Sequence, residues 1–160
     1  NLIKNLVKDI DGNTLVLFNY VEKHGMPLYE LINNNVDSAR KVFFVHGGTD
    51  VEDREEVRNL TETESNAIIV ASYGTFSTGI NIKRLHNIVF ASPSKSRIRN
   101  LQSIGRVLRK GEGKDIATLY DIADDIGGQN YTLKHLNERV NIYNNENFKY
   151  EVIRVNLRAN

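Results

Sequence analysis

The 160-residue chain contains 40% hydrophobic and 26% charged residues, a composition typical of a folded globular protein rather than a disordered or fibrous one. Its net charge is +1, so attraction to a polyanion depends on local clustering of basic residues. The chain has no cysteine and four histidines, none of them three or four positions apart. This excludes disulfides, thiolate catalysis and cysteine-ligated zinc, and it shows no helical His–His metal site.

Short apolar runs alternate with segments of helical spacing. Residues 1–12 are expected to be the end of an entering helix or a linker, and residues 13–160 to form the domain. Strands are predicted at Thr14–Phe18, Val42–Val45, Ala67–Ala71, Ile88–Ala91, Ile116–Ile122 and Tyr150–Leu157. Helices are predicted over Tyr20–Asn33, Asp50–Glu64, Ser96–Lys110 and Thr132–Asn145. The alternation predicts a three-layer α/β fold with a mostly parallel sheet of about six strands and helices on both faces. Residues 126–160 are expected to add the final helix and strand to that sheet.

The predicted helix Ser96–Lys110 carries the strongest chemical signal. Because each helical residue turns about 100°, Gln102, Gly105, Arg106 and Arg109 share an arc of about 100°, opposite an apolar stripe. Guanidinium groups donate paired hydrogen bonds to phosphate, and an arginine supplied by another domain can stabilise the transition state of phosphoryl transfer. A solvated basic helix face has the same spacing, so spacing alone leaves both interpretations open.

Basic residues gather around this helix. Between Lys95 and Lys114 there are seven Lys and Arg residues and a single acid, Glu112. A third of the basic residues of the chain therefore lies in this short stretch, on an otherwise balanced protein. Such clustering predicts a face that binds a polyanion.

A loop rich in hydroxyl groups and glycine, residues 72–81, follows the predicted strand Ala67–Ala71. Open α/β sheets bind ligands at the carboxyl ends of their strands. Hydroxyl and backbone N–H groups suit a phosphodiester backbone and read no base sequence. An ordinary strand-to-helix loop has a similar composition, so this loop alone does not decide the function.

The chain lacks a phosphate-binding loop of the G-x-x-x-x-G-K-[ST] type. The chain therefore has arginines that could contact a nucleotide but no loop that would bind the phosphates of that nucleotide. The simplest interpretation is half of a nucleotide site, completed by another domain.

Four segments, in a matching order between residues 15 and 110, resemble motifs of superfamily 2 helicases. They are Leu15–Asn19 for motif IV, His46–Gly48 for IVa, the loop ending Thr78-Gly79-Ile80-Asn81 for motif V, and Gln102-x-x-Gly105-Arg106-x-x-Arg109 for motif VI. Asn81 stands where the family usually has Asp. Residues 134–143 are similar to the C-terminal ends of phage helicases related to the XPB group.

The resemblance implies the second RecA-like domain of a two-domain motor. ATP and Mg²⁺ would bind mainly to an N-terminal RecA-like domain, the partner in the same protein. The resemblance implies that Arg109 is the arginine finger, that Arg106 is a second phosphate or interdomain contact, and that Gln102 is a polar link to nucleotide or nucleic acid. Gly79 and Asn81 would belong to the loop that couples nucleotide to DNA.

Contacts to the nucleic-acid backbone are expected from Ser72, Thr75 and Thr78, and from Asn19 and Gly47. The resemblance implies unwinding or branch migration of branched DNA in recombination and repair, with DNA or an RNA–DNA hybrid as partner. We expect no metal site in this chain, no membrane partner, a cytoplasmic location, and no ATPase activity from the chain alone.

Two other classes of protein stay open. One is a non-catalytic nucleic-acid-binding α/β module that uses the basic helix only as a polyanion surface. The other, a flavodoxin-like small-molecule binder, is disfavoured by the paired arginines. We expect His46 to be hydrogen-bonded within its loop, His135 and Arg139 to be solvated, and Tyr143 and Tyr150 to be packing residues.

Overall fold

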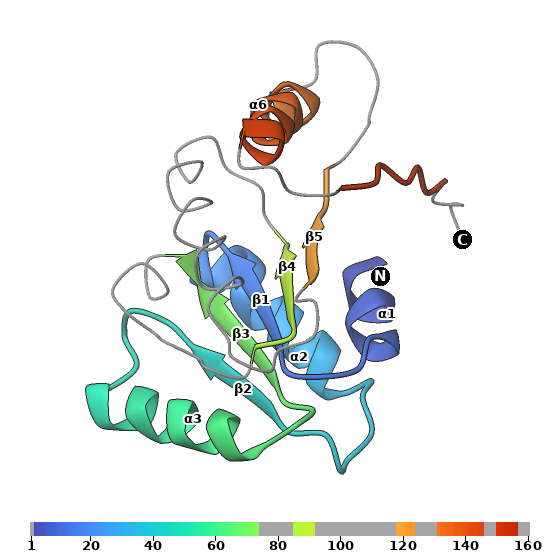
Figure 1. The fold of residues 1–160 in the computed structure, drawn as a ribbon. Coiled ribbons are helices and arrows are strands. Elements are labelled where there is room, and N and C mark those ends of the chain that lie inside the picture. Colours follow the sequence, from blue (N-terminus) through green and yellow to red (C-terminus); the bar gives the residue numbers. More distant parts are fainter. Residues whose placement is uncertain (1, 74–84, 92–117, 124–130, 146–149, 157–160) are drawn as a thin grey trace.

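The computed structural model describes residues 2–73, 85–91, 118–123, 131–145 and 150–156. Within these ranges, five strands form one sheet in the order β2-β3-β1-β4-β5 (Figure 1). The strands are β1 (Thr14–Phe18), β2 (Val42–Val45), β3 (Ile68–Ser72), β4 (Asn87–Phe90) and β5 (Thr118–Asp121). Every pairing is parallel, as the alternation of strands and helices predicted.

The strands are apolar on both sides because helices cover both faces of the sheet. All residues of β1 and β3, the strands at the centre, are buried. Successive side chains point to opposite faces. Accordingly, Leu15 and Leu17 join one core cluster, whereas Val16 and Phe18 join the other.

Each face has its own helices. On the face of Val16 and Phe18, buried residues come from α1 (Leu2–Asp9) and α2 (Met26–Asn33). The opposite face is covered by α3 (Val51–Thr63) and α6 (Tyr131–Asn145) through residues that include Val57 and Tyr143. The result is the predicted three-layer α/β architecture.

The predicted helix Tyr20–Asn33 is two elements. One turn of π-helix, η1 (Val21–Gly25), comes first, with the Gly25 N–H donating to the Tyr20 carbonyl at 3.0 Å. The following helix α2 has Pro27 at its start, where the missing N–H costs no helical hydrogen bond. Gly25 lies against the ring of Phe18, which leaves no room for a side chain.

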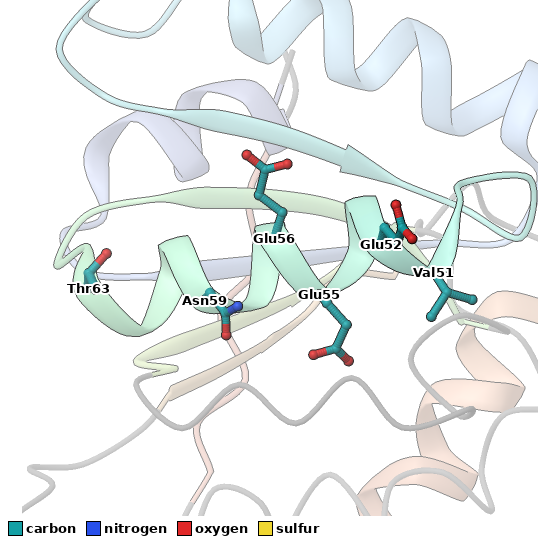
Figure 2. A pocket seen from close by; sticks show the side chains of 6 residues that line it. All are labelled: Val51, Glu52, Glu55, Glu56, Asn59 and Thr63. Atoms are coloured by element: carbon teal, nitrogen blue, oxygen red, sulfur yellow. The ribbon is translucent and has the colours of Figure 1, made fainter.

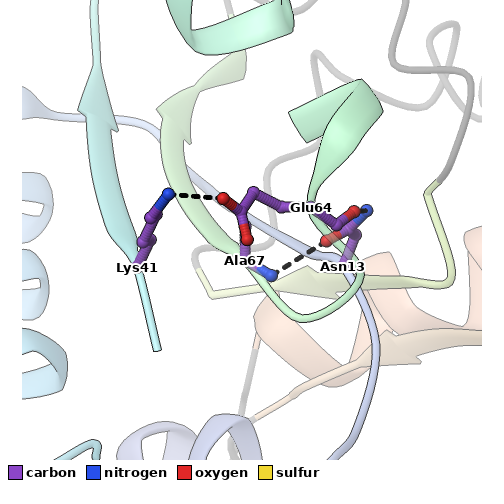
Figure 3. Close-up of polar contacts among 4 residues, drawn as sticks. All are labelled: Asn13, Lys41, Glu64 and Ala67. Atoms are coloured by element: carbon purple, nitrogen blue, oxygen red, sulfur yellow. Dashed lines mark hydrogen bonds and ion pairs between the residues drawn. The ribbon is translucent and has the colours of Figure 1, made fainter. Parts of the chain in front are cut away.

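A polar cluster closes the sheet at the amino ends of its strands. The fully buried Asn13 accepts a hydrogen bond from Ala67 N at 2.8 Å and donates one to the Glu64 carbonyl at 2.7 Å. The Glu64 carboxylate forms an ion pair with Lys41 (Figure 3). The chain entering β1 is thereby tied to the turn before β3.

Arg40 fastens helix α1 to the body of the domain. Its guanidinium donates to the main-chain carbonyls of Val7, Ile10 and Gly12 at 2.9–3.3 Å, and its Nε donates to Asn66 O at 3.0 Å. Burial lowers the pKa of Arg40, and the nearby Asp11 opposes that effect. Helix α1 is therefore a packed part of this domain.

The C-terminal segment differs from expectation. A strand was predicted over Tyr150–Leu157, but residues 150–156 are irregular and exposed. A β-type sequence becomes a strand only when a neighbouring strand supplies ladder hydrogen bonds, and these residues have none. The described sheet therefore has five strands instead of about six. Among the described residues, no helix has the length and apolar character needed to span a bilayer.

Candidate nucleic-acid and nucleotide interface

Three of the predicted contact residues meet at the carboxyl ends of neighbouring strands. Phe18 pairs with Ser72 across β1 and β3, so Asn19 lies one residue beyond that pair. Val45 of β2 pairs with Ala71 of β3, and Gly47 follows two residues later. Asn19, Ser72 and Gly47 are thus brought to one edge of the sheet, the edge at which α/β proteins bind ligands. Their contact with nucleic acid stays a prediction.

The loop after β2 holds its shape through His46. The His46 N–H donates to the Thr49 hydroxyl at 3.1 Å, and the Gly48 N–H donates to His46 Nδ1 at 3.0 Å. The imidazole also lies against Phe44, with ring centroids 5.2 Å apart. Since Nδ1 accepts a hydrogen bond, Nε2 carries the proton of the neutral ring. The expectation of a locally hydrogen-bonded histidine is confirmed.

Gly47 is the open point of this loop. It is exposed, and a Cβ built on it would meet nothing within 4 Å. A Cβ on Gly48, by contrast, would lie 2.9 Å from the imidazole of His46. The backbone at Gly47 can therefore be approached closely by a ligand, whereas a side chain at position 48 would require the imidazole of His46 to move.

Ser72 and Tyr73 lead into the hydroxyl-rich loop. Ser72 is only 9% exposed, so it offers a ligand little surface. The ring of Tyr73 is buried against Phe90. The other predicted residues of this loop lie outside the described residues; they are Thr75, Thr78, Gly79 and Asn81.

Strand β4 ends at the same edge of the sheet. Ala91 follows β4, and its N–H donates to the Leu17 carbonyl of β1 at 2.9 Å. Ala91 thus lies beside Leu17, which is two residues before Asn19 in the sequence. The predicted helix Ser96–Lys110, with Gln102, Arg106 and Arg109, lies outside the described residues.

Helix α3 carries a hollow with an acidic lining. Figure 2 shows it with six side chains, of which three are carboxylates. The lining residues are Val51, Glu52, Glu55, Glu56, Asn59 and Thr63. Because carboxylates repel phosphate, this face of α3 is unfavourable for a polyanion.

The sequence analysis missed a buried ionic cluster between β5 and α6. Arg139 donates to Asp121 through Nε at 2.6 Å and Nη2 at 2.8 Å, and the Tyr143 hydroxyl donates to Asp121 Oδ2 at 2.6 Å. Arg139 is only 2% exposed, so the prediction that it is solvated is wrong. Arg139 Nη1 is buried and has no hydrogen-bond acceptor among the described residues.

A signal for this cluster exists in the sequence. Asp121 lies two residues after the inward-facing Leu119, so both side chains point to the same buried face of the sheet. A buried carboxylate is stable only when it is paired with a cation or with hydrogen-bond donors. Arg139 and Tyr143 are four residues apart, so they share one side of a helix. Burial and the charge of Asp121 raise the pKa of Tyr143, which keeps its hydroxyl a neutral donor. Tyr143 is a packing residue, as expected.

The types of polar side chain at the strand ends indicate which ligands this part of the domain can hold. Within the described ranges, no cluster of three or more His, Asp or Glu side chains could hold a metal ion. The polar groups at the carboxyl ends of β1, β2 and β3 are the Asn19 amide, the His46 imidazole, the Ser72 hydroxyl and backbone groups. Such groups suit phosphate oxygens better than a divalent cation.

A parallel sheet covered by helices on both faces, with phosphate-compatible groups at its carboxyl edge, is typical of α/β domains that bind nucleotides or nucleic acids. The comparison with known families makes this class specific. Residues 1–111 match the helicase conserved C-terminal domain, and the chain belongs to that family.

Two curated relatives support this assignment. The chain is 43% identical over 160 aligned residues to the ATP-dependent DNA helicase uvsW of Enterobacteria phage T4, covering 92% of this chain and 31% of the relative. It is 30% identical over 116 residues to the putative ATP-dependent RNA helicase L396 of Acanthamoeba polyphaga mimivirus, covering 72% of this chain and 20% of that protein. The chain thus spans less than a third of the length of these relatives.

Solved structures show the same RecA-like fold. Domain 2 of the DEAD-box helicase Mss116p, bound to an RNA duplex, aligns with a TM-score of 0.66 and 18% identity, covering 89% of this chain and 53% of that one. The C-terminal part of the Fun30 ATPase domain aligns with a TM-score of 0.64 and 18% identity, covering 85% of this chain and 43% of that one.

Proposed function

We propose that this chain is the C-terminal motor domain of an ATP-dependent superfamily 2 DNA helicase or translocase. In that role it unwinds or branch-migrates branched DNA in recombination and repair, in the cytoplasm of a phage-infected or bacterial cell. The observation that carries the proposal is the convergence of Asn19, Ser72 and Gly47 at the sheet edge where β4 also ends. Family membership and the DNA helicase relative support it.

The nucleotide would lie between this domain and an N-terminal RecA-like domain. Arg109 supplies the arginine finger to the γ-phosphate, and Arg106 makes a second phosphate or interdomain contact. Gln102, Gly79 and Asn81 add polar contacts to the nucleotide. Mg²⁺ would be held mainly by the N-terminal domain. Guanidinium groups serve here because they carry charge at every physiological pH and match the geometry of phosphate.

The nucleic acid would be held by its phosphates. Ser72, Thr75 and Thr78 contact the backbone of one strand, with further contacts from Asn19 and the open backbone at Gly47. Backbone contacts carry no base sequence, so translocation is insensitive to sequence, and it weakens as salt rises.

The cycle couples these two sites. ATP bridges the two domains in a closed state that Arg106 and Arg109 stabilise. Hydrolysis and release of phosphate remove this bridge, so the domains part. The loop that grips the strand then shifts relative to its counterpart in the other domain.

The substitution Arg109→Ala in the full-length protein tests the proposal. We expect ATP turnover to fall by about 10³-fold or more, with DNA affinity largely retained. Arg97→Ala, a change of the same kind in the same basic stretch, is the control. In a non-catalytic polyanion-binding module, both substitutions would weaken DNA binding equally and neither would affect a nucleotide. Wild-type turnover in Arg109→Ala, or robust ATPase activity from the isolated chain, contradicts the proposal.

A further inference from the structure

The buried rings of Tyr73 and Phe90 are in contact, and they lie at the carboxyl ends of β3 and β4, the strands that precede the two proposed functional segments. Tyr73 follows β3 and precedes the rest of the hydroxyl-rich loop in the sequence, and Phe90 is the last residue of β4, which precedes the predicted arginine helix in the sequence. Their ring centroids lie 5.8 Å apart at an interplanar angle of 56°, and the residues are 2% and 3% exposed. A displacement of one ring must therefore be accommodated by the other.

Helix α6 reaches the same place through β5. Phe90 is the register partner of Asp121, the carboxylate that Arg139 and Tyr143 hold. Tyr143 belongs to the same buried cluster as Tyr73 and Phe90. The ring contact between Tyr73 and Phe90 thus connects the ends of β3 and β4 past the intervening β1, and Asp121 of β5 connects Phe90 to α6.

The stability of the fold does not by itself explain why the charged side chains of Asp121 and Arg139 are buried. Replacing a buried ion pair by apolar residues of similar volume is often neutral or stabilising, so burial of Asp121 and Arg139 is weak evidence for a stabilising role. What the pair provides is geometry. Two parallel N–H···O bonds fix the guanidinium in the plane of the carboxylate, and the Tyr143 hydroxyl fixes one of its oxygens.

We propose that Asp121, Arg139 and Tyr143 are positioning residues that couple nucleic-acid binding at the loop after β3 to ATP turnover at the arginine segment after β4. The inference rests on the proposed function. By holding β5 and α6 against Phe90, the three side chains keep the carboxyl ends of β3 and β4 in one relative position. Binding of nucleic acid at the end of β3 then changes the geometry at the end of β4. Without the cluster, nucleic-acid binding at the end of β3 no longer changes the geometry at the end of β4.

The test compares ATP turnover of the full-length protein with and without DNA. Tyr143→Phe removes only the hydroxyl, and Arg139→Lys keeps the charge but loses the bidentate geometry. Arg154→Lys, on the exposed segment 150–156, is the matched control. We expect the first two variants to keep basal turnover within about twofold while the stimulation by DNA falls about fivefold or more. The control should behave as the wild type.

Other outcomes overturn the inference, each in a recognisable way. Unchanged stimulation in both variants shows that the cluster does not couple the sites. A parallel fall of basal and stimulated turnover, together with a lower melting temperature, shows a merely structural role. Tyr143→Phe keeps the test decisive if Arg139→Lys does not fold. A wild-type protein with no DNA-stimulated turnover would overturn the proposed function together with this inference, whereas unaltered variants of a stimulated wild type overturn the inference alone.

Discussion

The guanidinium of Arg40 donates a hydrogen bond of 2.9 Å to the main-chain carbonyl of Val7, at the end of helix α1. The last carbonyls of a helix have no partner within the helix, and a cation there also complements the helix dipole. Val7 itself is buried among the residues that cover one face of the sheet. A side chain from the loop before β2 thus completes the helix that begins the domain and sets its direction.

The Arg40→Ala variant tests this relationship. It leaves up to four main-chain carbonyls without their donor, so we expect a loss of about 2–3 kcal/mol in the free energy of unfolding. Urea denaturation followed by circular dichroism measures it. Arg154→Ala, a truncation of an exposed arginine, should change the free energy by less than about 0.5 kcal/mol. Equal effects of the two substitutions would show that Arg40 does not hold α1.

Gly25→Ala should destabilise the protein through overpacking. A Cβ at this position would lie 2.4 Å from Phe18 Cε2, and Phe18 is itself fully buried. We expect a loss of about 1–3 kcal/mol, measured as a lower urea midpoint with an unchanged slope. A stability equal to that of the wild type would mean that η1 moves freely away from the ring.

Sequence reasoning recovered the sheet well because its signal is local. The runs at Thr14–Phe18 and Val42–Val45 coincide with β1 and β2, since buried parallel strands are uninterrupted apolar runs bounded by polar residues. The convergence of Asn19, Ser72 and Gly47 could also be predicted. It follows from parallel topology alone, which places the carboxyl ends of all strands at one edge.

The remaining features depend on contacts between distant residues. The π-turn before α2 is set by the close approach of Gly25 to Phe18, which no helical periodicity encodes. Arg139 looked like a solvated residue because its partner lies 18 positions away on β5. The segment 150–156 has the composition of a strand, but composition does not show whether an edge is available to pair with it.

Asn13→Ala should be among the most destabilising single changes at the amino edge of the sheet. Its fully buried side chain satisfies Ala67 N–H and the Glu64 carbonyl, and both groups would lose their partner. We expect a cost of about 2–4 kcal/mol by thermal or urea denaturation. The matched control is Asn66→Ala, which removes an exposed acceptor for Gly12 N–H and should cost about 1 kcal/mol or less. A smaller cost at position 13 than at position 66 would contradict this account.

Gly47→Ala should separate binding from folding. Nothing lies within 4 Å of the added Cβ, so stability should stay within about 0.5 kcal/mol of the wild type. If a phosphate approaches the backbone there, the methyl group should weaken DNA affinity by about 3–10-fold, measured by fluorescence anisotropy at fixed salt. Glu55→Gln on α3 removes a repelling charge and should leave affinity unchanged or slightly higher. Unchanged affinity in Gly47→Ala removes this glycine from the interface.

Tyr143 should make the protein sensitive to alkali. Burial and the charge of Asp121 raise the pKa of Tyr143 in the folded state above its ordinary value, which the unfolded chain restores. A raised folded-state pKa contributes stability that is fully present below the unfolded pKa of about 10. That contribution is lost as the pH rises further, because only the unfolded chain then readily releases the proton. Tyr143→Phe should therefore lose less stability than the wild type between about pH 9 and pH 11. The difference in urea midpoint between the two proteins cancels the contribution of the other tyrosines. If the two midpoints change in parallel across that pH range, the Tyr143 hydroxyl is not held against a carboxylate.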